Sequence, residues 1–248
     1  MGLVDPSARR LVAVAKVPLG VLSRQAIAHE ADILARLERE KPDIAPRLLY
    51  VNNETGVAVQ EAMGGMPTAR KLSLAHVDWL LNMAIPGETI SLKEYAEGLA
   101  ERISKLDDNH QEPCDALVSM LSGINASSIL PVVWVHGDFA PWNLKRGQDG
   151  AITAVDWEMS FPKGLPLFDL VYFGSIQAFL FKEKRIVPAS MKALLRQYLD
   201  NLGIDPGISQ TLILTCLIED WLRCHKKGNH QRAFFLFRHL RMELEKRT

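Results

Sequence analysis

Hydrophobic positions in the first sixty residues alternate between a strand period and a helix period. Residues 11–17, LVAVAKV, form a β-branched apolar run with one lysine, which predicts a buried strand. Ser23 is placed to cap a following helix. In that helix Ile27, Ala31 and Leu34 recur at helical spacing. PRLLYVN and GVAVQEA predict two further strands joined by the turn NNETG.

A glycine-rich cluster, MGGMP at residues 63–67, predicts a boundary between two lobes. We expect a β-rich N-terminal lobe over residues 1–63 and a mainly helical lobe over 64–248. Ser91 and Glu94 form a capping box that predicts the start of a helix. The fold class is therefore predicted as α+β. Further helices are expected at about 167–181, 189–202, 207–225 and 230–246, and short strands at about 132–136, 143–146 and 151–156.

Composition narrows the possible partners. The 248 residues are 48% hydrophobic, and 29 basic residues balance 29 acidic ones, so no overall field favours nucleic acid or an anionic membrane. The N-terminal MGLVDPSARR has no apolar segment of a signal peptide, and the apolar runs are too short to span a bilayer. Cys114, Cys216 and Cys224 form no CxxC pair, which indicates a reducing setting. We expect a soluble cytoplasmic protein, and the sequence leaves its oligomeric state open.

Two charged residues occupy positions that the pattern predicts to be buried. Lys16 lies inside the apolar strand 11–17, and Glu30 lies on the buried stripe of the following helix. Because an isolated buried charge is costly, each needs a partner, and each is a candidate for the other. These two residues alone leave a second interpretation equally open, in which Lys16 extends its ammonium to water and Glu30 lies at the edge of the stripe.

The stretch VHGDFAPWNL carries a set of hard oxygen ligands. Asp138 is followed five residues later by Asn143, and Asp156 ends the next apolar run. Two tightly joined strands would bring Asn143 and Asp156 side by side, and Mg²⁺ prefers carboxylate and amide oxygens. Asp138 could then accept a proton from a hydroxyl group. We interpret the bulky Phe139 and Trp142 as groups that hold this loop in place.

Together with the lysine and glutamate, this set matches the requirements of phosphoryl transfer. HGDFAPWN followed by AVDWEMSFPKGLPLFDL resembles the aminoglycoside phosphotransferase / choline kinase family, small-molecule kinases of the protein-kinase-like fold. The family pattern H-G-D-x-x-x-x-N, an I/V-D-W/F-E strand end and G-x-P-x-x-D-L opening a helix are all present, in order. The resemblance is strong from His136 to Leu170 and moderate from Leu11 to Met66.

The resemblance implies ATP and Mg²⁺ as cofactors and a role for each candidate residue. Asp138 would be the catalytic base, and Asn143 and Asp156 would bind the metal. The resemblance also implies a set of nucleotide-binding residues. This set comprises Lys16 on the phosphates, Glu30 orienting Lys16, and the backbone of Glu61, Ala62 and Met63 at the adenine.

The N-terminus departs from the family pattern. The family opens with a strand-loop-strand hairpin that covers the phosphates, whereas only ten residues precede Leu11 here. Ten residues form one loop or a short strand, but not two strands and their turn. We therefore expect a truncated N-terminal β lobe. Three accounts stay open: a fragment or mis-started reading frame, the tail of a larger polypeptide, or a chain that manages with metal and Lys16 alone.

The sequence thus predicts an ATP- and Mg²⁺-dependent phosphotransferase acting on a hydroxyl of a small molecule. The acceptor classes considered are a sugar or polyol, an amino alcohol and an aminoglycoside, and a sugar or polyol is favoured. The basic residues of 221–248 disfavour a polycationic aminoglycoside, although a solvated basic helix face is a simpler interpretation of them than an anion site. The pair Glu219–Asp220 could meet a cation such as choline. The alternative function is a catalytically impaired kinase-like nucleotide-binding or scaffold module, or a fragment of a longer kinase. A protein kinase fits poorly, because D-F-G and A-P-E segments are absent.

Overall fold

The computed structural model describes residues 1–5, 10–106, 111–124 and 128–245, and its elements are α+β, as the sequence predicts. The chain divides into two compact units. One consists of Met1–Met83 with Trp134–Pro162, and the other of Ala84–Val133 with Lys163–Thr248. The loop with Asp138 and Asn143 therefore belongs to the same unit as the N-terminal sheet. The lobe boundary after residue 63 stays a prediction.

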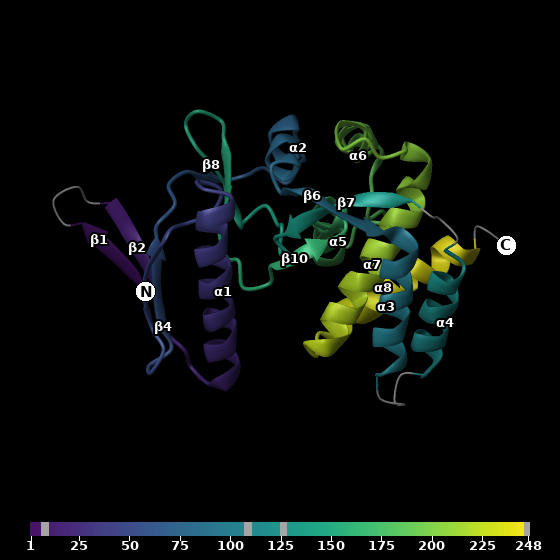
Figure 1. Ribbon diagram of the computed structural model, residues 1–248, viewed down its shortest axis with the longest axis horizontal. Coiled ribbons are helices and arrows are strands. Elements are labelled where there is room, and N and C mark those ends of the chain that lie inside the picture. Colours follow the sequence, from purple (N-terminus) through teal and green to yellow (C-terminus); the bar gives the residue numbers. More distant parts are fainter. Residues whose placement is uncertain (6–9, 107–110, 125–127, 246–248) are drawn as a thin grey trace. The chain divides into compact units, whose positions relative to one another are not determined.

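An antiparallel sheet with one helix forms the N-terminal part of the first unit (Figure 1). Ile27 and Ala31 of the helix pack on Ala58 of the sheet, so the apolar stripe covers one sheet face. One short strand precedes the strand that carries Lys16, and the two strands pair directly. The sheet order is β1 (Gly2–Asp5), β2 (Arg10–Lys16), β4 (Val57–Glu61) and β3 (Leu48–Asn52), and the helix is α1 (Val21–Glu40).

The start of α1 differs from the prediction by three residues. The helix begins at Val21, and Ser23 lies in its first turn. The Ser23 hydroxyl accepts hydrogen bonds from the backbone N–H groups of Leu19 (2.8 Å) and Gly20 (2.9 Å). Serine is therefore used at this helix start, but as an acceptor reaching back rather than as the cap itself, because Gly20 supplies the extended residue before the helix.

A second, three-stranded sheet completes the first unit. Its order is β5 (Met66–Pro67), β8 (Leu144–Arg146) and β9 (Ile152–Ala154), and α2 (Leu74–Leu81) lies between β5 and the second unit in the sequence. Gly65 has φ 101°, and a Cβ there would lie 2.5 Å from the carbonyl oxygen of Arg146. The glycine cluster thus permits a close backbone approach to β8.

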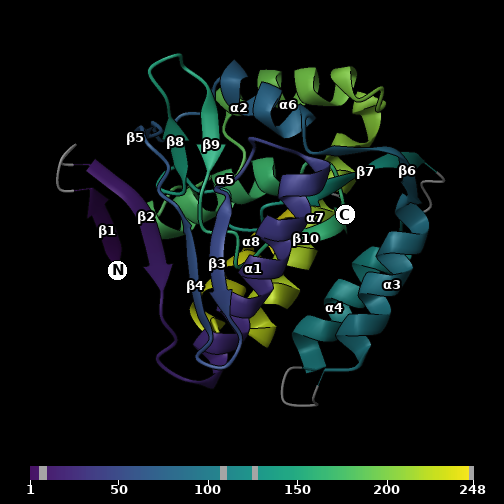
Figure 2. The same ribbon diagram turned by 60° about the vertical axis from the view of Figure 1, so that its left-hand side comes forward.

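The second unit is mainly helical. Helices α3 and α4 lie side by side, as do α7 and α8, in both views of the molecule (Figures 1 and 2). Ser91 caps α3 by accepting from the N–H of Glu94 at 3.3 Å, as the capping pattern predicts. The helices are α3 (Leu92–Ser104), α4 (Gln111–Ser122), α5 (Phe168–Phe181), α6 (Ala189–Asn201), α7 (Ser209–Lys226), preceded by a short 3₁₀ helix (Pro206–Ile208), and α8 (His230–Glu245).

The region before Ser91 is a strand, where the sequence predicts mostly helix. Strand β6 (Ala84–Ser91) pairs antiparallel with β7 (Ile129–Val135), and β10 (Phe161–Gly164) completes the sheet order β10-β7-β6. The sequence of β6, AIPGETIS, combines β-branched residues with a Pro-Gly pair, which disfavours a helix.

Among the described residues, the helices are all too short or too polar to cross a membrane.

Candidate active site

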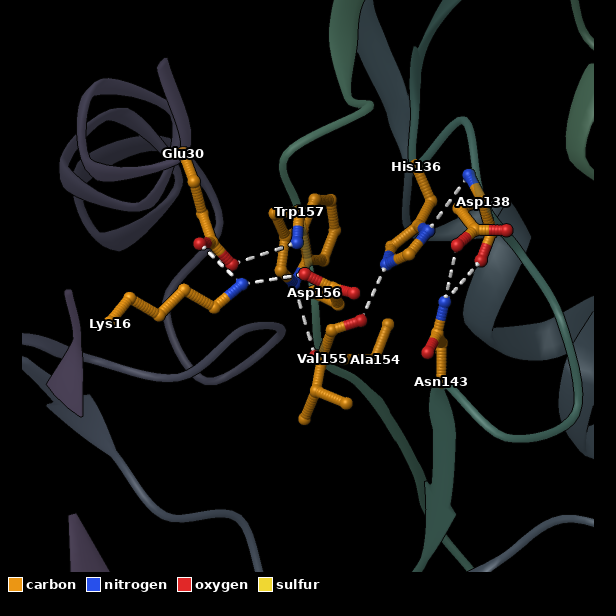
Figure 3. Close-up of polar contacts among 9 residues, drawn as sticks. All are labelled: Lys16, Glu30, His136, Asp138, Asn143, Ala154, Val155, Asp156 and Trp157. Atoms are coloured by element: carbon orange, nitrogen blue, oxygen red, sulfur yellow. Dashed lines mark hydrogen bonds and ion pairs between the residues drawn. The ribbon is translucent and has the colours of Figure 1, made fainter. Parts of the chain in front are cut away.

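Lys16 lies at the end of β2 and forms two ion pairs (Figure 3). Its Nζ is 2.7 Å from Oε2 of Glu30 on α1 and 2.6 Å from Oδ1 of Asp156, which follows β9. The Glu30 side chain is only 3% exposed, whereas that of Lys16 is 23% exposed. The structure therefore contains the Lys16–Glu30 pair that the burial pattern suggests, and it adds Asp156 as a second partner.

Burial and charge act in opposite directions on this pair. Burial tends to lower the pKa of Lys16, but Glu30 and Asp156 outweigh it, so the pKa lies above the usual value and the amine is an ammonium at neutral pH. Burial raises the pKa of Glu30, and Lys16 counteracts the rise only in part. Glu30 also accepts the backbone N–H of Trp157 at 3.0 Å. That bond joins α1 to the segment holding Asp156, a link for which the sequence offers no signal.

A tight hairpin positions Asp156. In the ladder between β8 and β9, Leu144 lies opposite Ala154, and the N–H of Val155 donates to the carbonyl oxygen of Asn143 at 2.8 Å. Asn143 and Asp156 are thereby set at the same end of the hairpin. Asp156 adopts φ 69°, a left-handed conformation that is unfavourable for a residue with a side chain and is concentrated at functional sites.

Asp138 and Asn143 are joined within the loop between β7 and β8. Nδ2 of Asn143 donates to Oδ2 of Asp138 at 2.8 Å and to its backbone oxygen at 3.0 Å. In Figure 3 the amide oxygen of Asn143 points away from Asp138. Asn143 is 6% exposed, so its amide is held in one orientation. The loop thus fixes the carboxylate of Asp138 against a buried amide.

His136 braces the same loop. The backbone N–H of Asp138 donates to its Nδ1 at 3.3 Å, so Nδ1 is unprotonated and Nε2–H donates to the carbonyl oxygen of Val155 at 3.1 Å. Burial lowers the pKa of His136, in agreement with a neutral ring. His136 is therefore a packed, hydrogen-bonded residue that supports the loop.

The donor atoms at this end of the unit fit a magnesium ion. Carboxylate and amide oxygens are the ligands that Mg²⁺ prefers, and Asn143 uses its amide hydrogens on Asp138, which leaves its oxygen for a cation. One carboxylate oxygen of Asp156, Oδ1, accepts a hydrogen bond from Lys16, and the second oxygen could bind the cation. In the part of the chain that the structure describes, no cluster of three or more His, Cys, Asp or Glu side chains forms a metal site. The candidate set therefore depends on the amide of Asn143.

Three residues are predicted to lie at the adenine. Glu61 is the last residue of β4, and Ala62 and Met63 follow it in the linker. The N–H of Glu61 donates to Arg47 at 2.9 Å and that of Ala62 to Val12 at 3.0 Å. The N–H of Met63 makes no hydrogen bond to another described residue. Of the three backbone donors, only that of Met63 is thus available to a ligand.

The acidic pair on α7 is already paired within the second unit. Glu219 accepts hydrogen bonds from Arg102 and from the Tyr95 hydroxyl, and Asp220 pairs with Arg232 at 2.6 Å. Glu219 and Asp220 are 3% and 4% exposed. The suggestion that this pair meets a cation such as choline is therefore not supported, because both carboxylates are buried and neutralised.

Solved structures of small-molecule kinases are similar to this chain. Choline kinase LicA from Streptococcus pneumoniae is 16% identical, with a TM-score of 0.62 over 94% of this chain and 86% of that one. Macrolide 2'-phosphotransferase MphH from Brachybacterium faecium is 14% identical, with a TM-score of 0.58 over 92% and 83%. APH(2'')-IIIa, solved as a complex with GDP and kanamycin, is 13% identical, with a TM-score of 0.58 over 96% of this chain and 88% of that one. These likenesses establish the protein-kinase-like fold.

Sequence comparison identifies the family. None of the curated protein sequences matches the chain. The model of the phosphotransferase enzyme family matches residues 60–204, which is more than half of the 248 residues and includes the loop with Asp138 and Asn143 and the hairpin that ends at Asp156. The chain belongs to the phosphotransferase enzyme family.

Proposed function

We propose that this protein transfers the γ-phosphate of ATP, with Mg²⁺, to a hydroxyl group of a small molecule. The observation that carries the proposal is the ion-pair chain from Glu30 through Lys16 to Asp156, one hairpin away from the joined Asp138 and Asn143. Phosphoryl transfer depends mainly on positioning and on neutralising charge, and this set supplies groups for both.

The nucleotide would be bound by groups from two elements. Lys16 would neutralise the phosphates while Glu30 keeps its side chain in place, and the free N–H of Met63, beyond Glu61 and Ala62, would donate to the adenine. Two solved neighbours favour nucleotide use: LicA has been determined with AMP, and APH(2'')-IIIa with GDP. We extend that use to this chain on the strength of the shared fold and of Lys16.

Asp138 is the proposed base. Its carboxylate would accept the proton of the acceptor hydroxyl while that oxygen forms a bond to the γ-phosphorus and the bond from phosphorus to the departing ADP oxygen breaks. Asn143 would keep Asp138 oriented through the bond to Oδ2. Magnesium, held by Asn143 and Asp156, would supply charge neutralisation at the phosphates.

A neutral sugar or polyol is the proposed acceptor class. The arginine partners of Glu219 and Asp220 argue against a polycation held by these two carboxylates of α7. The cytoplasmic location suggested by the sequence stays part of the proposal. The three cysteines are free thiols, and burial raises the pKa of Cys216 and Cys224, which suits a reducing compartment.

The test is ligand-induced stabilisation combined with turnover. Mg²⁺-ATP at 100 times its Kd should stabilise the protein by about 2.7 kcal/mol, a rise in Tm of roughly 5–10 °C. We expect Asp156→Asn to lose this shift, because metal and phosphate binding both depend on it. Asp138→Asn should keep the shift and lose ATP consumption with an acceptor, because only the base is removed.

Asp32→Asn is the matched control, because Asp32 is exposed on the same helix as Glu30 and should leave both readouts unchanged. A shift that persists in Asp156→Asn would contradict the metal assignment. A shift in the native chain without turnover on any hydroxyl compound would favour the alternative, a nucleotide-binding module. The absence of any shift at millimolar nucleotide would refute the proposed function.

A further inference from the structure

Trp142 is the exposed residue of the catalytic loop. From residue 132 to residue 144, every side chain is buried except those of Asp138, which is half-buried, and Trp142, which is 40% exposed. Phe139 is completely buried, as expected of a residue that anchors the loop. Trp142 departs from that expectation, since its indole makes no hydrogen bond, ring contact or ion pair with another described residue.

The backbone around Trp142 is held on both sides. The N–H of Asn143 donates to the carbonyl oxygen of Ala140 at 2.9 Å, which closes a turn around Trp142. Thr68 donates its hydroxyl to the carbonyl oxygen of Pro141 at 3.3 Å and its N–H to that of Leu144 at 2.9 Å. A large aromatic ring is therefore presented to solvent by a loop that is itself fixed. Burying about half of an exposed indole would be favourable, so a ligand stacked there gains affinity at little entropic cost.

The position of Trp142 relates it to the acceptor. It immediately precedes Asn143, whose amide is hydrogen-bonded to the carboxylate of Asp138 (Figure 3). If Asp138 removes the proton from the acceptor hydroxyl, the rest of the acceptor must lie within a few ångströms of this turn. The indole is the largest exposed apolar surface that the turn provides.

The chemistry of the indole favours a neutral hydroxylated ring over a cation. A sugar ring can lay its C–H face on the indole, or one of its hydroxyl oxygens can accept a hydrogen bond from Nε1–H at the ring edge, whereas a quaternary ammonium group has no atom that can accept one. Quaternary ammonium ligands are held by cages of several aromatic rings, and Trp142 has no aromatic neighbour among the described residues.

We infer that Trp142 is the acceptor-binding platform of this enzyme and that its ligand is a neutral sugar or cyclic polyol. The inference rests on the proposed function, because it places the acceptor beside Asp138. It adds a specificity-determining residue to that site and narrows the proposed polyols to cyclic ones.

The distribution of tryptophans provides a direct assay. Iodide in water quenches exposed indoles, so it reports on Trp142 in this chain. We would measure iodide quenching in the presence of D-glucose, D-galactose, N-acetylglucosamine, D-ribose or myo-inositol. The concentration of each compound would rise in roughly 20-fold steps to ~50 mM, a range that spans the Kd of a weak ligand, about 1 mM. The other four of the five tryptophans are buried: Trp79 (6% exposed), Trp134 (1%), Trp157 (0%) and Trp221 (3%).

We expect at least one of these sugars or polyols to protect Trp142 from iodide and choline to give no protection. By calorimetry, Trp142→Ala should weaken binding of the protecting compound roughly tenfold, the equivalent of about 1.4 kcal/mol, while Trp142→Phe keeps most of the affinity. In turnover assays the KM for the acceptor should rise and the KM for ATP should not. Phe234→Ala, which removes a 63% exposed ring from α8, is the matched control and should change neither.

Two results of the quenching assay would overturn the inference: no protection by any of the five compounds, or protection by choline alone. An unchanged acceptor KM in Trp142→Ala would do the same. Binding of Mg²⁺-ATP, measured by calorimetry on the same samples, separates this failure from failure of the proposed function. If ATP binds and the indole is not protected, only the role of Trp142 is wrong, and if ATP does not bind, the proposed function is wrong whatever the sugars do.

Discussion

Gly174 and Gly98 allow the same substitution to be tested with opposite expected signs. Gly174 lies inside α5, where a Cβ would be 2.1 Å from the carbonyl oxygen of Ile186, in the segment leading to α6. Gly98 lies on the exposed face of α3, where a Cβ would meet no atom within 4 Å. Replacing either glycine by alanine improves helix propensity by about 1 kcal/mol. Only the surroundings distinguish the two positions.

The clash at Gly174 decides the sign there. Ordinary contact begins at 3.4 Å, so α5 and the backbone at Ile186 must separate by about 1 Å in a unit where α5 is almost entirely buried. Overpacking costs about 1–3 kcal/mol, and a rigid backbone oxygen places this site at or above the upper end. After the propensity gain is subtracted, we expect Gly174→Ala to destabilise the protein by about 2 kcal/mol, a fall in Tm of roughly 4–8 °C.

Gly98→Ala should stabilise the protein by about 0.4–1 kcal/mol, because the helix gains propensity and the unfolded chain loses freedom. Urea unfolding followed by circular dichroism, with Tm from calorimetry, would compare both variants with the native chain. The reasoning would be refuted by a Gly174→Ala protein at least as stable as the native one. A loss of stability in both variants would also refute it, since that would mean that alanine is harmful for a reason other than the contact with Ile186.

Three further predictions concern charged groups. Glu30→Gln should raise the KM for ATP by roughly tenfold or more, because Lys16 then keeps only one charged partner, the partly exposed Asp156. Steady-state kinetics would measure this change. Asp220→Asn should destabilise the protein by about 3–5 kcal/mol in urea unfolding, because it leaves Arg232 buried without a counter-charge. Burial and a nearby arginine lower the pKa of His76 to about 4, so native stability should fall by about 3 kcal/mol as pH falls from 6.5 to 4, and His76→Asn should flatten that slope.

The pairing of Lys16 with Glu30 was a candidate from the sequence, because periodicity identifies the buried stripe and a charge on it needs a counter-charge. The pattern fits an ammonium that extends to water equally well, and only the structure decides between the two. The third member of this ion-pair chain, Asp156, could be placed beside Asn143 by the pairing of two short strands, but not against Lys16. Its contact depends on the left-handed backbone at φ 69° and on the bond from Trp157 to Glu30, and neither leaves a mark in the local sequence. The roles of these residues stay predictions until the variants are tested.

Elements with long or well-capped periodic patterns were predictable, and short paired strands were not. The capping box at Ser91 has a local physical cause, and the structure has α3 beginning where it indicates. Strand β6 has no such signal, because it is stabilised by pairing with β7, some forty residues further along the chain. Strand β1 depends in the same way on β2, and the first residues of the chain alone were compatible with a loop or a strand.

The acidic pair of α7 shows why acceptor specificity is the least predictable property of this chain. Two adjacent acids on a helix point in different directions, yet both Glu219 and Asp220 are buried. Glu219 is neutralised by an arginine 117 residues earlier in the sequence, and Asp220 by Arg232, 12 residues later. A carboxylate is available to a cationic substrate only if no such partner exists, and partners that distant cannot be read from local pattern. The reverse holds for Trp142, a residue of a type that is usually buried. It is left exposed by a loop that is held both by its own turn and by the distant Thr68, so its indole, unlike the two acids, is available to an acceptor.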